Sequence, residues 1–117
     1  MKPKTKTTVK RAAKPTTTGR PVLVANERYG LYVGYASATD AEIVSTRSVR
    51  LAQCRHVCHW RGRTGGITSL AAFGPCGPRM MESRIGAPVT SALVTGVVNV
   101  FDLTPEAVAA FAQIVAT

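Results

Sequence analysis

The chain is 117 residues long, which suits one small domain with a short appendage. Its apolar content of 45% is that of a globular protein, and no apolar run approaches the ~20 residues that a membrane-spanning helix needs. The formal net charge of +9 is unevenly distributed, because every lysine lies among the first 14 residues.

Residues 1–20 predict an extended, disordered arm. Lysine and threonine alternate there, two prolines interrupt them, and so little apolar surface cannot offset the entropy lost on folding. No acid balances the cations of the arm, so we expect it to bind a partner through charge. Its seven cationic residues are Lys2, Lys4, Lys6, Lys10, Arg11, Lys14 and Arg20. Residues 21–117 carry eight arginines and six acids, are close to neutral, and predict a single compact domain.

The first half of this domain predicts mainly strands. β-branched and alternating apolar residues recur in five segments that turn residues separate. These segments are 21–25, 31–37, 41–45, 48–53 and 54–60. Turns are expected at 26–30 and 38–40, and Gly34 inside the second segment indicates a bulge or a close approach of another backbone.

The region after residue 60 predicts a loop, a helix and a second loop. Residues 61–66 are basic and rich in glycine, and residues 67–73 have the composition of a short helix that Gly74 ends. The segment 74–88 begins with four glycines or prolines among five residues, so we expect it to be irregular.

The last part of the chain predicts the strongest strand and the clearest helix. Residues 89–101 are rich in β-branched side chains, and Gly96 is expected to bend or split the strand. Thr104 and Pro105 are typical of a helix start, as N-cap and first helical residue. Apolar side chains then recur with helical spacing, which predicts a face packed on the sheet. The residues of this predicted face are Val108, Phe111, Ala112 and Val115.

Together these elements predict an α+β fold. We expect a small curved antiparallel sheet or partly open β-barrel with one short helix and a C-terminal helix, preceded by the extended basic arm. The core should consist mainly of small β-branched residues, with the few large aromatic side chains as its bulky anchors. These aromatic residues are Tyr29, Tyr32, Tyr35, Trp60, Phe73, Phe101 and Phe111.

Cysteine and histidine crowd into one predicted strand as Cys54, His56, Cys58 and His59, and Cys76 follows in a loop. Zinc takes thiolate and imidazole ligands in a tetrahedron. On a strand the first three side chains face one side at steps of about 6.6 Å, so together they span too far for one ion. We therefore expect cysteines in the core, histidines on a polar surface and no bound metal. An odd number of cysteines also argues against a disulfide framework.

No motif in the sequence predicts an enzyme. The glycine-rich nucleotide-binding, serine-hydrolase and zinc-protease signatures are absent, and only six acids occur. Cys76 lies on a Gly/Pro loop where a nucleophile would be accessible, but no carboxylate is placed to orient a histidine beside it. We expect a binding protein without a cofactor.

Arginines recur in and around the two predicted loops. Guanidinium groups suit phosphate and carboxylate, so these residues predict an anion-binding or partner-binding surface. The predicted surface consists of Arg61, Arg63, Arg79 and Arg84, with Arg55 beside them. Two solvated loops without a ligand are the alternative reading, since surface arginines are common.

Five segments in a fixed order carry a resemblance to a known family. They are GLYVG (30–34), LAQCRHVCHW (51–60), LAAFGP (70–75), SRIG (83–86) and LTPEAV (103–108). Over roughly residues 30–112 this order resembles an uncharacterised small domain family that is common in tailed phages and prophages. The resemblance implies a viral or mobile-element origin and brings no known activity. The basic arm and the Cys/His content of residues 54–59 depart from the family pattern.

Three functions are compatible with these observations. The first is a non-enzymatic phage structural or assembly protein, of the head-decorating or minor capsid type, whose arm binds neighbouring subunits of a viral particle. The second is a sequence-independent nucleic-acid-binding protein that acts through the arm. The third is a small regulatory or host-defence-antagonising phage protein. We expect an oligomeric or assembly-bound protein in the virion or the host cytoplasm, without membrane contact.

Overall fold

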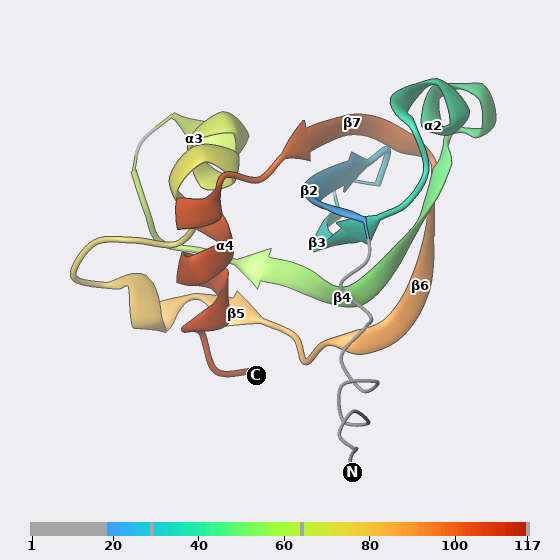
Figure 1. Cartoon of the computed structure of the whole chain (residues 1–117). Coiled ribbons are helices and arrows are strands. Elements are labelled where there is room, and N and C mark those ends of the chain that lie inside the picture. Colours follow the sequence, from blue (N-terminus) through green and yellow to red (C-terminus); the bar gives the residue numbers. More distant parts are fainter. Residues whose placement is uncertain (1–18, 29, 64, 117) are drawn as a thin grey trace, which may run out of the picture.

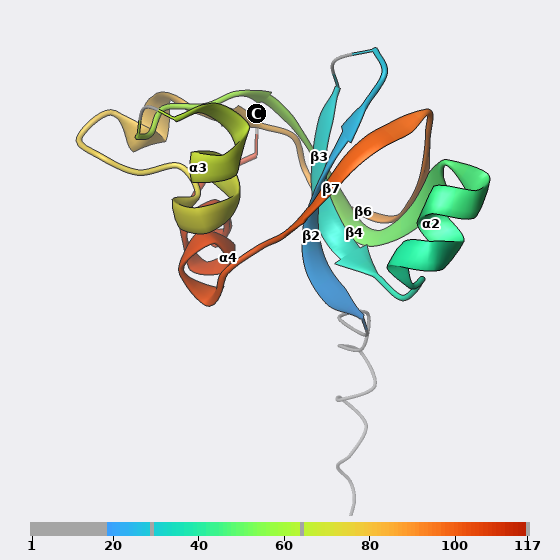
Figure 2. The same cartoon turned by 90° about the horizontal axis from the view of Figure 1, so that it is seen from above.

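The computed structural model describes residues 19–28, 30–63 and 65–116. Apart from its last two residues, the predicted arm therefore lies outside the described residues. The described chain forms six strands in one antiparallel sheet and three α-helices, which confirms the predicted α+β class (Figure 1). The sheet curls but does not close into a barrel. Figure 2 shows helices α3 and α4 on one side of it and α2 on the other.

The first two predicted strands form a hairpin. Strands β2 (Arg20–Asn26) and β3 (Leu31–Ala36) pair antiparallel across the turn at 26–30. The side chain of Asn26 holds this turn, because its Oδ1 accepts hydrogen bonds from the backbone N–H groups of Arg28 (3.1 Å) and Gly30 (2.8 Å). Asparagine is favoured in turns for this local bonding.

The strand predicted at 41–45 is wrong, because these residues belong to helix α2 (Asp40–Thr46). Thr39 and Glu42 form a capping box: the Thr39 hydroxyl accepts from the Glu42 N–H (3.2 Å) and the Glu42 carboxylate accepts from the Thr39 N–H (2.8 Å). These bonds satisfy N–H groups that a helix start leaves free. They outweigh the β-branched composition of the segment, from which Ile43 is buried against the sheet.

A single long strand, β4 (Ser48–His59), replaces the two strands predicted at 48–53 and 54–60. It pairs with β3 on one side and, on the other, first with β6 and then with β5. The pairing with β3 shifts register opposite Gly34, where Gln53 has a left-handed backbone (φ 52°). A Cβ atom on Gly34 would lie 2.9 Å from the Ala52 carbonyl oxygen, which confirms the predicted close approach.

The predicted strand at 89–101 is split at Gly96 into β6 (Val89–Thr95) and β7 (Val97–Asp102), as expected. β6 pairs with β4, whereas β7 pairs with β2, so this run bridges two parts of the curled sheet. The bend is held from both sides. The Gly96 carbonyl accepts from the Glu27 N–H (2.7 Å), and the Val97 N–H donates to the Arg47 carbonyl (3.0 Å).

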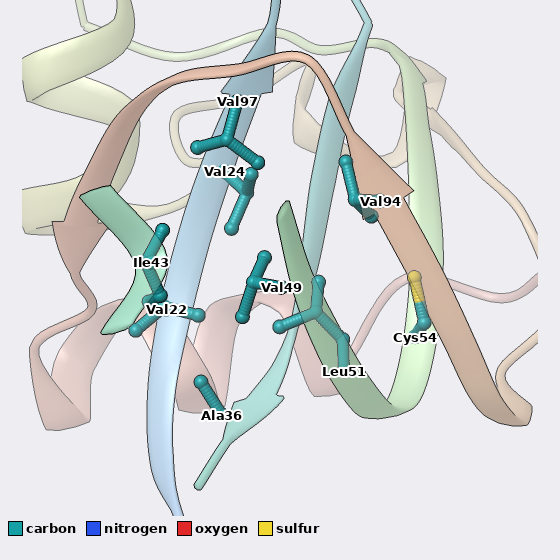
Figure 3. Close-up of a cluster of buried hydrophobic side chains, with 9 residues drawn as sticks. All are labelled: Val22, Val24, Ala36, Ile43, Val49, Leu51, Cys54, Val94 and Val97. Carbon is teal, nitrogen blue, oxygen red and sulfur yellow. The ribbon is translucent and has the colours of Figure 1, made fainter. Parts of the chain in front are cut away.

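Buried side chains form one cluster on each side of the sheet. The first cluster, which Figure 3 shows, fills the concave side under α2 and consists of Val22, Val24, Ala36, Ile43, Val49, Leu51, Cys54, Val94 and Val97. The second lies under α3 and α4 and consists of Leu23, Val33, Val57, Leu70, Ala71, Ile85, Phe111 and Ile114. The β-branched core is thus confirmed.

The aromatic anchors were predicted wrongly for most of the aromatic residues that the structure describes. Of these, Phe111 alone is in the buried core, and leucine, isoleucine and valine account for most of the largest fully buried side chains. Tyr32, Trp60 and Phe101 pack only at the edges of the two clusters. Tyr29 lies outside the described residues.

Helices α3 (Gly66–Phe73) and α4 (Pro105–Ala112) confirm the predicted helices and pack on each other. Gly74 ends α3 with φ +69°, and a Cβ there would lie 2.8 Å from the Ala110 side chain. Thr104 caps α4, because its hydroxyl accepts from the Ala107 N–H (3.0 Å).

The face of α4 that packs on the sheet differs from the prediction. The buried residues are Ala107, Ala110, Phe111 and Ile114, whereas Ala112 and Val115 are exposed. The same helical spacing fits both sets, shifted by one residue. The small side chains of Ala107 and Ala110 decide between them, since they let the backbone at Gly74 come close.

The segment 74–88 is more regular than predicted. It contains a 3₁₀ turn, η2 (Met80–Glu82), and a short strand, β5 (Arg84–Ile85), that pairs with the end of β4. The glycines and prolines disrupt only its first residues. The pairing with β4 is possible because Ile85 enters the second buried cluster.

The guanidinium of Arg55 joins β4 to the C-terminal part of the chain. It donates hydrogen bonds to four carbonyl groups, those of Gly86 (2.7 Å), Phe111 (2.9 Å), Ile114 (2.9 Å) and Ile85 (3.4 Å). The last carbonyls of a helix lack the regular partners of its interior, and this side chain supplies a donor to Phe111 in the last turn of α4 and another to Ile114 just after the helix. Arg55 is therefore committed to the fold, and the prediction that it belongs to an anion-binding surface is wrong.

We expect Gly34→Ala to destabilise the protein by about 1–3 kcal/mol, because the new methyl group would overlap the β4 backbone. Gly86→Ala is the matched control, since a Cβ there meets its nearest atom at 3.8 Å. Its free energy of unfolding should stay within about 0.5 kcal/mol of the parent value. Chemical denaturation measures both changes, and equal effects would contradict the close approach at Gly34.

We expect Arg55→Met to destabilise the protein by about 3 kcal/mol, because it removes charged donors from several half-buried carbonyl groups at once. Arg50→Met should have an effect below about 0.5 kcal/mol, since that exposed arginine makes a single bond to the Ser91 hydroxyl. Urea unfolding of the two variants compares them directly. The role of Arg55 would be refuted by similar midpoints.

Candidate functional site

Two loops beyond the end of β4 enclose an open hollow of about 520 Å³, which we call the arginine hollow. It is lined by Arg61, Gly62, Arg63, Cys76, Gly77, Pro78, Arg79 and Glu106. The hollow thus combines residues from both predicted loops with one residue from the first turn of α4.

Backbone and hydroxyl bonds hold the two loops together. The Cys76 N–H donates to the Arg61 carbonyl (3.0 Å), so the loops touch beside the hollow. The Arg61 N–H donates to the hydroxyl of Ser83 (2.9 Å), the buried polar residue just before β5. The positions of the arginine backbones are therefore set by the fold, because a buried hydroxyl needs a hydrogen-bond partner.

The guanidinium of Arg63 lies over an aromatic ring. Its guanidinium carbon is 4.2 Å from the centre of the Phe73 ring, at the end of α3. This cation–π contact uses none of the N–H donors of the guanidinium in a hydrogen bond. Among the described residues, no carboxylate pairs with Arg63.

Glu82 holds the other two arginines. Arg79 donates to its carboxylate through Nε (3.0 and 3.1 Å) and Nη2 (2.7 Å). Arg61 Nε lies 3.5 Å from Glu82 Oε1, an ion-pair contact without a hydrogen bond. The hydrogen bonds from Arg79 lower the pKa of Glu82, and the charges of Arg79 and Arg61 act in the same direction. Glu82 stays ionised in neutral solution and keeps the two arginines beside each other.

Comparison with known proteins identifies the family of this α+β domain. The sequence matches Domain of unknown function (DUF6948) over residues 19–111. The chain belongs to this family. No curated protein and no solved structure matches it. The DUF6948 match begins one residue before β2, so nearly all of the basic arm lies outside it. The expected resemblance to an uncharacterised small domain family is confirmed, and its phage association remains a prediction.

The DUF6948 domain brings together three of the four arginines predicted to form an anion or partner surface. Arg61, Arg63 and Arg79 line the hollow, but Arg84 does not. Arg84 is exposed on β5 opposite His59, where strand pairing fixes it. Sequence reasoning missed Glu106 as a lining residue, since its place in a first helical turn explained it fully.

Arg20 is the one cation of the predicted arm that the structure describes. It is the first residue of β2, and its guanidinium pairs with Asp40 and with Asp102 (3.2 Å to the latter). The DUF6948 domain thus uses Arg20 to join β2 to the start of α2 and the end of β7. Lys2, Lys4, Lys6, Lys10, Arg11 and Lys14 lie outside the described residues.

The histidines of β4 are exposed as predicted, but the prediction that the cysteines lie in the core holds for Cys54 and is wrong for Cys58, which is exposed. Cys54 is in the first buried cluster, where burial raises the pKa of its thiol. His56 stacks on Tyr32 with ring centres 5.0 Å apart, and the Cys58 Sγ lies 3.4 Å from His56 Nδ1. Within the described ranges, no three His, Cys, Asp or Glu side chains gather as metal ligands. None of the described helices has the length and apolar character to cross a membrane.

We expect the Glu82 carboxylate to titrate below the ordinary glutamate range and Arg79→Ala to raise its pKa toward that range. Because the folded pKa is depressed, the stabilisation from this pair is complete above the ordinary glutamate pKa and is lost as the pH falls through the folded value. Carboxyl-carbon NMR titration measures the shift. Arg84→Ala is the control and should leave it unchanged. If the pKa of Glu82 is the same in Arg79→Ala as in the parent protein, the ion pair does not persist in solution.

Proposed function

We propose that this protein is a non-enzymatic phage structural or assembly protein, of the head-decorating or minor capsid type, that binds neighbouring subunits through its N-terminal arm. The division of charge carries the proposal. Residues 1–18 hold six cations and no acid, whereas residues 19–117 hold nine arginines and six acids. Two thirds of the net charge therefore lie on a segment that is almost entirely outside the family domain.

The composition of the arm favours a partner with an extended surface. Basic, proline-containing segments with few apolar residues gain structure by wrapping along a partner, through many weak contacts that offset the ordering entropy. In an assembly, each subunit offers such a surface to its neighbours. Because the domain resembles domains common in tailed phages, we infer that this assembly is a phage particle.

The DUF6948 domain itself has features that suit a protein neighbour. β6 pairs only with β4 and β7 only with β2, so in the described chain each leaves one edge unpaired. Exposed apolar side chains lie on these two strands, at Leu93 (53% exposed) and Val98 (54%). Apolar side chains on an unpaired strand commonly mark a surface that another chain covers.

The proposal is tested in particles assembled by the mobile element that encodes the protein. In the test variant, the five lysines and Arg11 become glutamine in the full-length chain, which removes the charge but keeps the length. We expect loss of at least tenfold in the amount that co-sediments with particles. In the control, exposed residues Arg28, Arg50 and Arg84 become glutamine, and incorporation should hold. The proposal would be refuted if particles incorporate the arm variant at parental levels. It would also be refuted if the parent protein itself is not found on the particles.

A second candidate function is sequence-independent nucleic-acid binding. It is favoured by the three arginines around the hollow, which add to the cations of the arm. Since Arg20 is paired with acids of the domain, the arm offers six phosphate contacts. These would give a log–log salt slope of up to about −5 on duplex DNA. The same arm variant distinguishes the two functions, because here it would lose DNA affinity rather than incorporation.

A further inference from the structure

We propose that the arginine hollow binds a phosphate group through Arg61, Arg63 and Arg79. This inference goes beyond the proposed function, since it gives the DUF6948 domain a ligand of its own and does not involve the arm. It rests on how the three guanidinium groups are held. In each case the holding contact leaves hydrogen-bond donors unused.

Arg63 is oriented without being neutralised. Its guanidinium rests on Phe73 at 4.2 Å, and it has no acid or hydrogen-bond partner among the described residues. This contact restricts the side chain without using any of the five N–H donors of the group. A ligand oxygen in the hollow would therefore bind an arginine side chain that has already lost part of its conformational freedom.

Arg79 and Arg61 share one acid between them. Arg79 uses Nε and Nη2 on Glu82, and Nη1 has no partner in the described chain. Arg61 has no hydrogen bond to Glu82, only the 3.5 Å ion-pair contact of its Nε. One carboxylate therefore positions two guanidinium groups and leaves Arg79 Nη1 and the terminal nitrogens of Arg61 without a partner in the described chain. With Glu106 on the lining as the second acid, the group of three arginines keeps a net positive charge.

This donor set suits phosphate better than a carboxylate. One arginine fork satisfies both oxygens of a carboxylate, whereas a phosphate group offers three or more acceptor oxygens and up to two charges. The loop also leaves space for the ligand. Gly77 has a left-handed backbone (φ +88°), and an added Cβ would meet nothing within 4 Å. The peptide backbone on this wall of the hollow is thus accessible.

The affinity of full-length protein for inorganic phosphate, measured by NMR titration of backbone and arginine Nε–H signals, tests the proposal. Arg63→Ala should weaken binding by about tenfold or more, as loss of a charged fork does. Arg63→Lys should also weaken it, because a point charge cannot replace the fork. Arg84→Ala is the matched control outside the hollow and should leave the affinity unchanged.

Glu106→Gln provides a test of opposite sign. Glu106 lines the hollow, so removing its charge should tighten phosphate binding by about threefold. Succinate, a dicarboxylate of comparable charge, should bind more weakly than phosphate. The proposal is overturned if phosphate shifts no signals of the hollow, if Arg63→Ala matches Arg84→Ala, or if succinate binds as well as phosphate.

The source of the phosphate is distinguished by a second ligand, a 15-nucleotide single-stranded DNA. If the hollow takes phosphodiesters, Arg63→Ala should reduce the magnitude of the salt slope by about 0.7, one phosphate contact, and Arg84→Ala should not. If Arg63→Ala changes only binding of inorganic phosphate, the ligand is a free phosphate or phosphate monoester. The arm variant with glutamines should retain phosphate binding, so failure of the arm proposal and failure of this one are separate results.

Discussion

One half-buried cation, the guanidinium of Arg55, links the parts of this fold. It extends from β4, the strand that pairs with three others, to carbonyl groups at the end of α4 and beside β5. At the end of α4 the Phe111 carbonyl thus accepts from Arg55 as well as from the Ile114 N–H, and the Ile114 carbonyl just beyond the helix accepts from Arg55 too. Burial lowers the pKa of Arg55, but an arginine remains charged at any physiological pH. This connection between sheet and helix is therefore independent of pH.

A single extra residue in β4 lets that strand serve both buried clusters. Before the bulge, Val49 and Leu51 point into the first cluster, with the alternation of a regular strand. The left-handed residue Gln53 shifts this alternation by one, so Cys54 also enters the first cluster and Val57 enters the second. Without the shift, every later side chain would face the opposite side. On β3, Gly34 lies opposite this extra residue, and its lack of a side chain leaves room for the displaced β4 backbone.

Much of this architecture was predictable from local signals. The Thr104–Pro105 helix start, the break at Gly96 and the close approach at Gly34 depend on residues whose backbone preferences hold in any context. The T-x-x-E signal at Thr39 and Glu42 was also present in the sequence, but the β-branched residues after it favoured a strand. The buried face of α4 was not decidable, since two apolar registers fit one helix and the contact with Gly74 selects between them.

The sequence predicted that arginines form the candidate site, but it did not predict which arginines line the hollow. Nothing in the sequence distinguishes Arg55, which bonds to four carbonyls, from Arg61, which lines the hollow. Three-dimensional pairing makes the distinction: β5 places Arg84 opposite His59, and Ser83 fixes the backbone of Arg61. No sequence pattern marks Glu82 either, although its carboxylate contacts two of the three arginines.

The position of β2 has a mechanical consequence. This strand lies between β3 and β7, and the chain that precedes it continues directly into the basic arm. Tension applied along the arm would enter the domain at Arg20 and pull β2 along its own axis. Two ladders of hydrogen bonds, both perpendicular to that pull, would have to shear together, along with the ion pairs to Asp40 and Asp102. The domain would thus resist unfolding under a force applied through its N-terminal end.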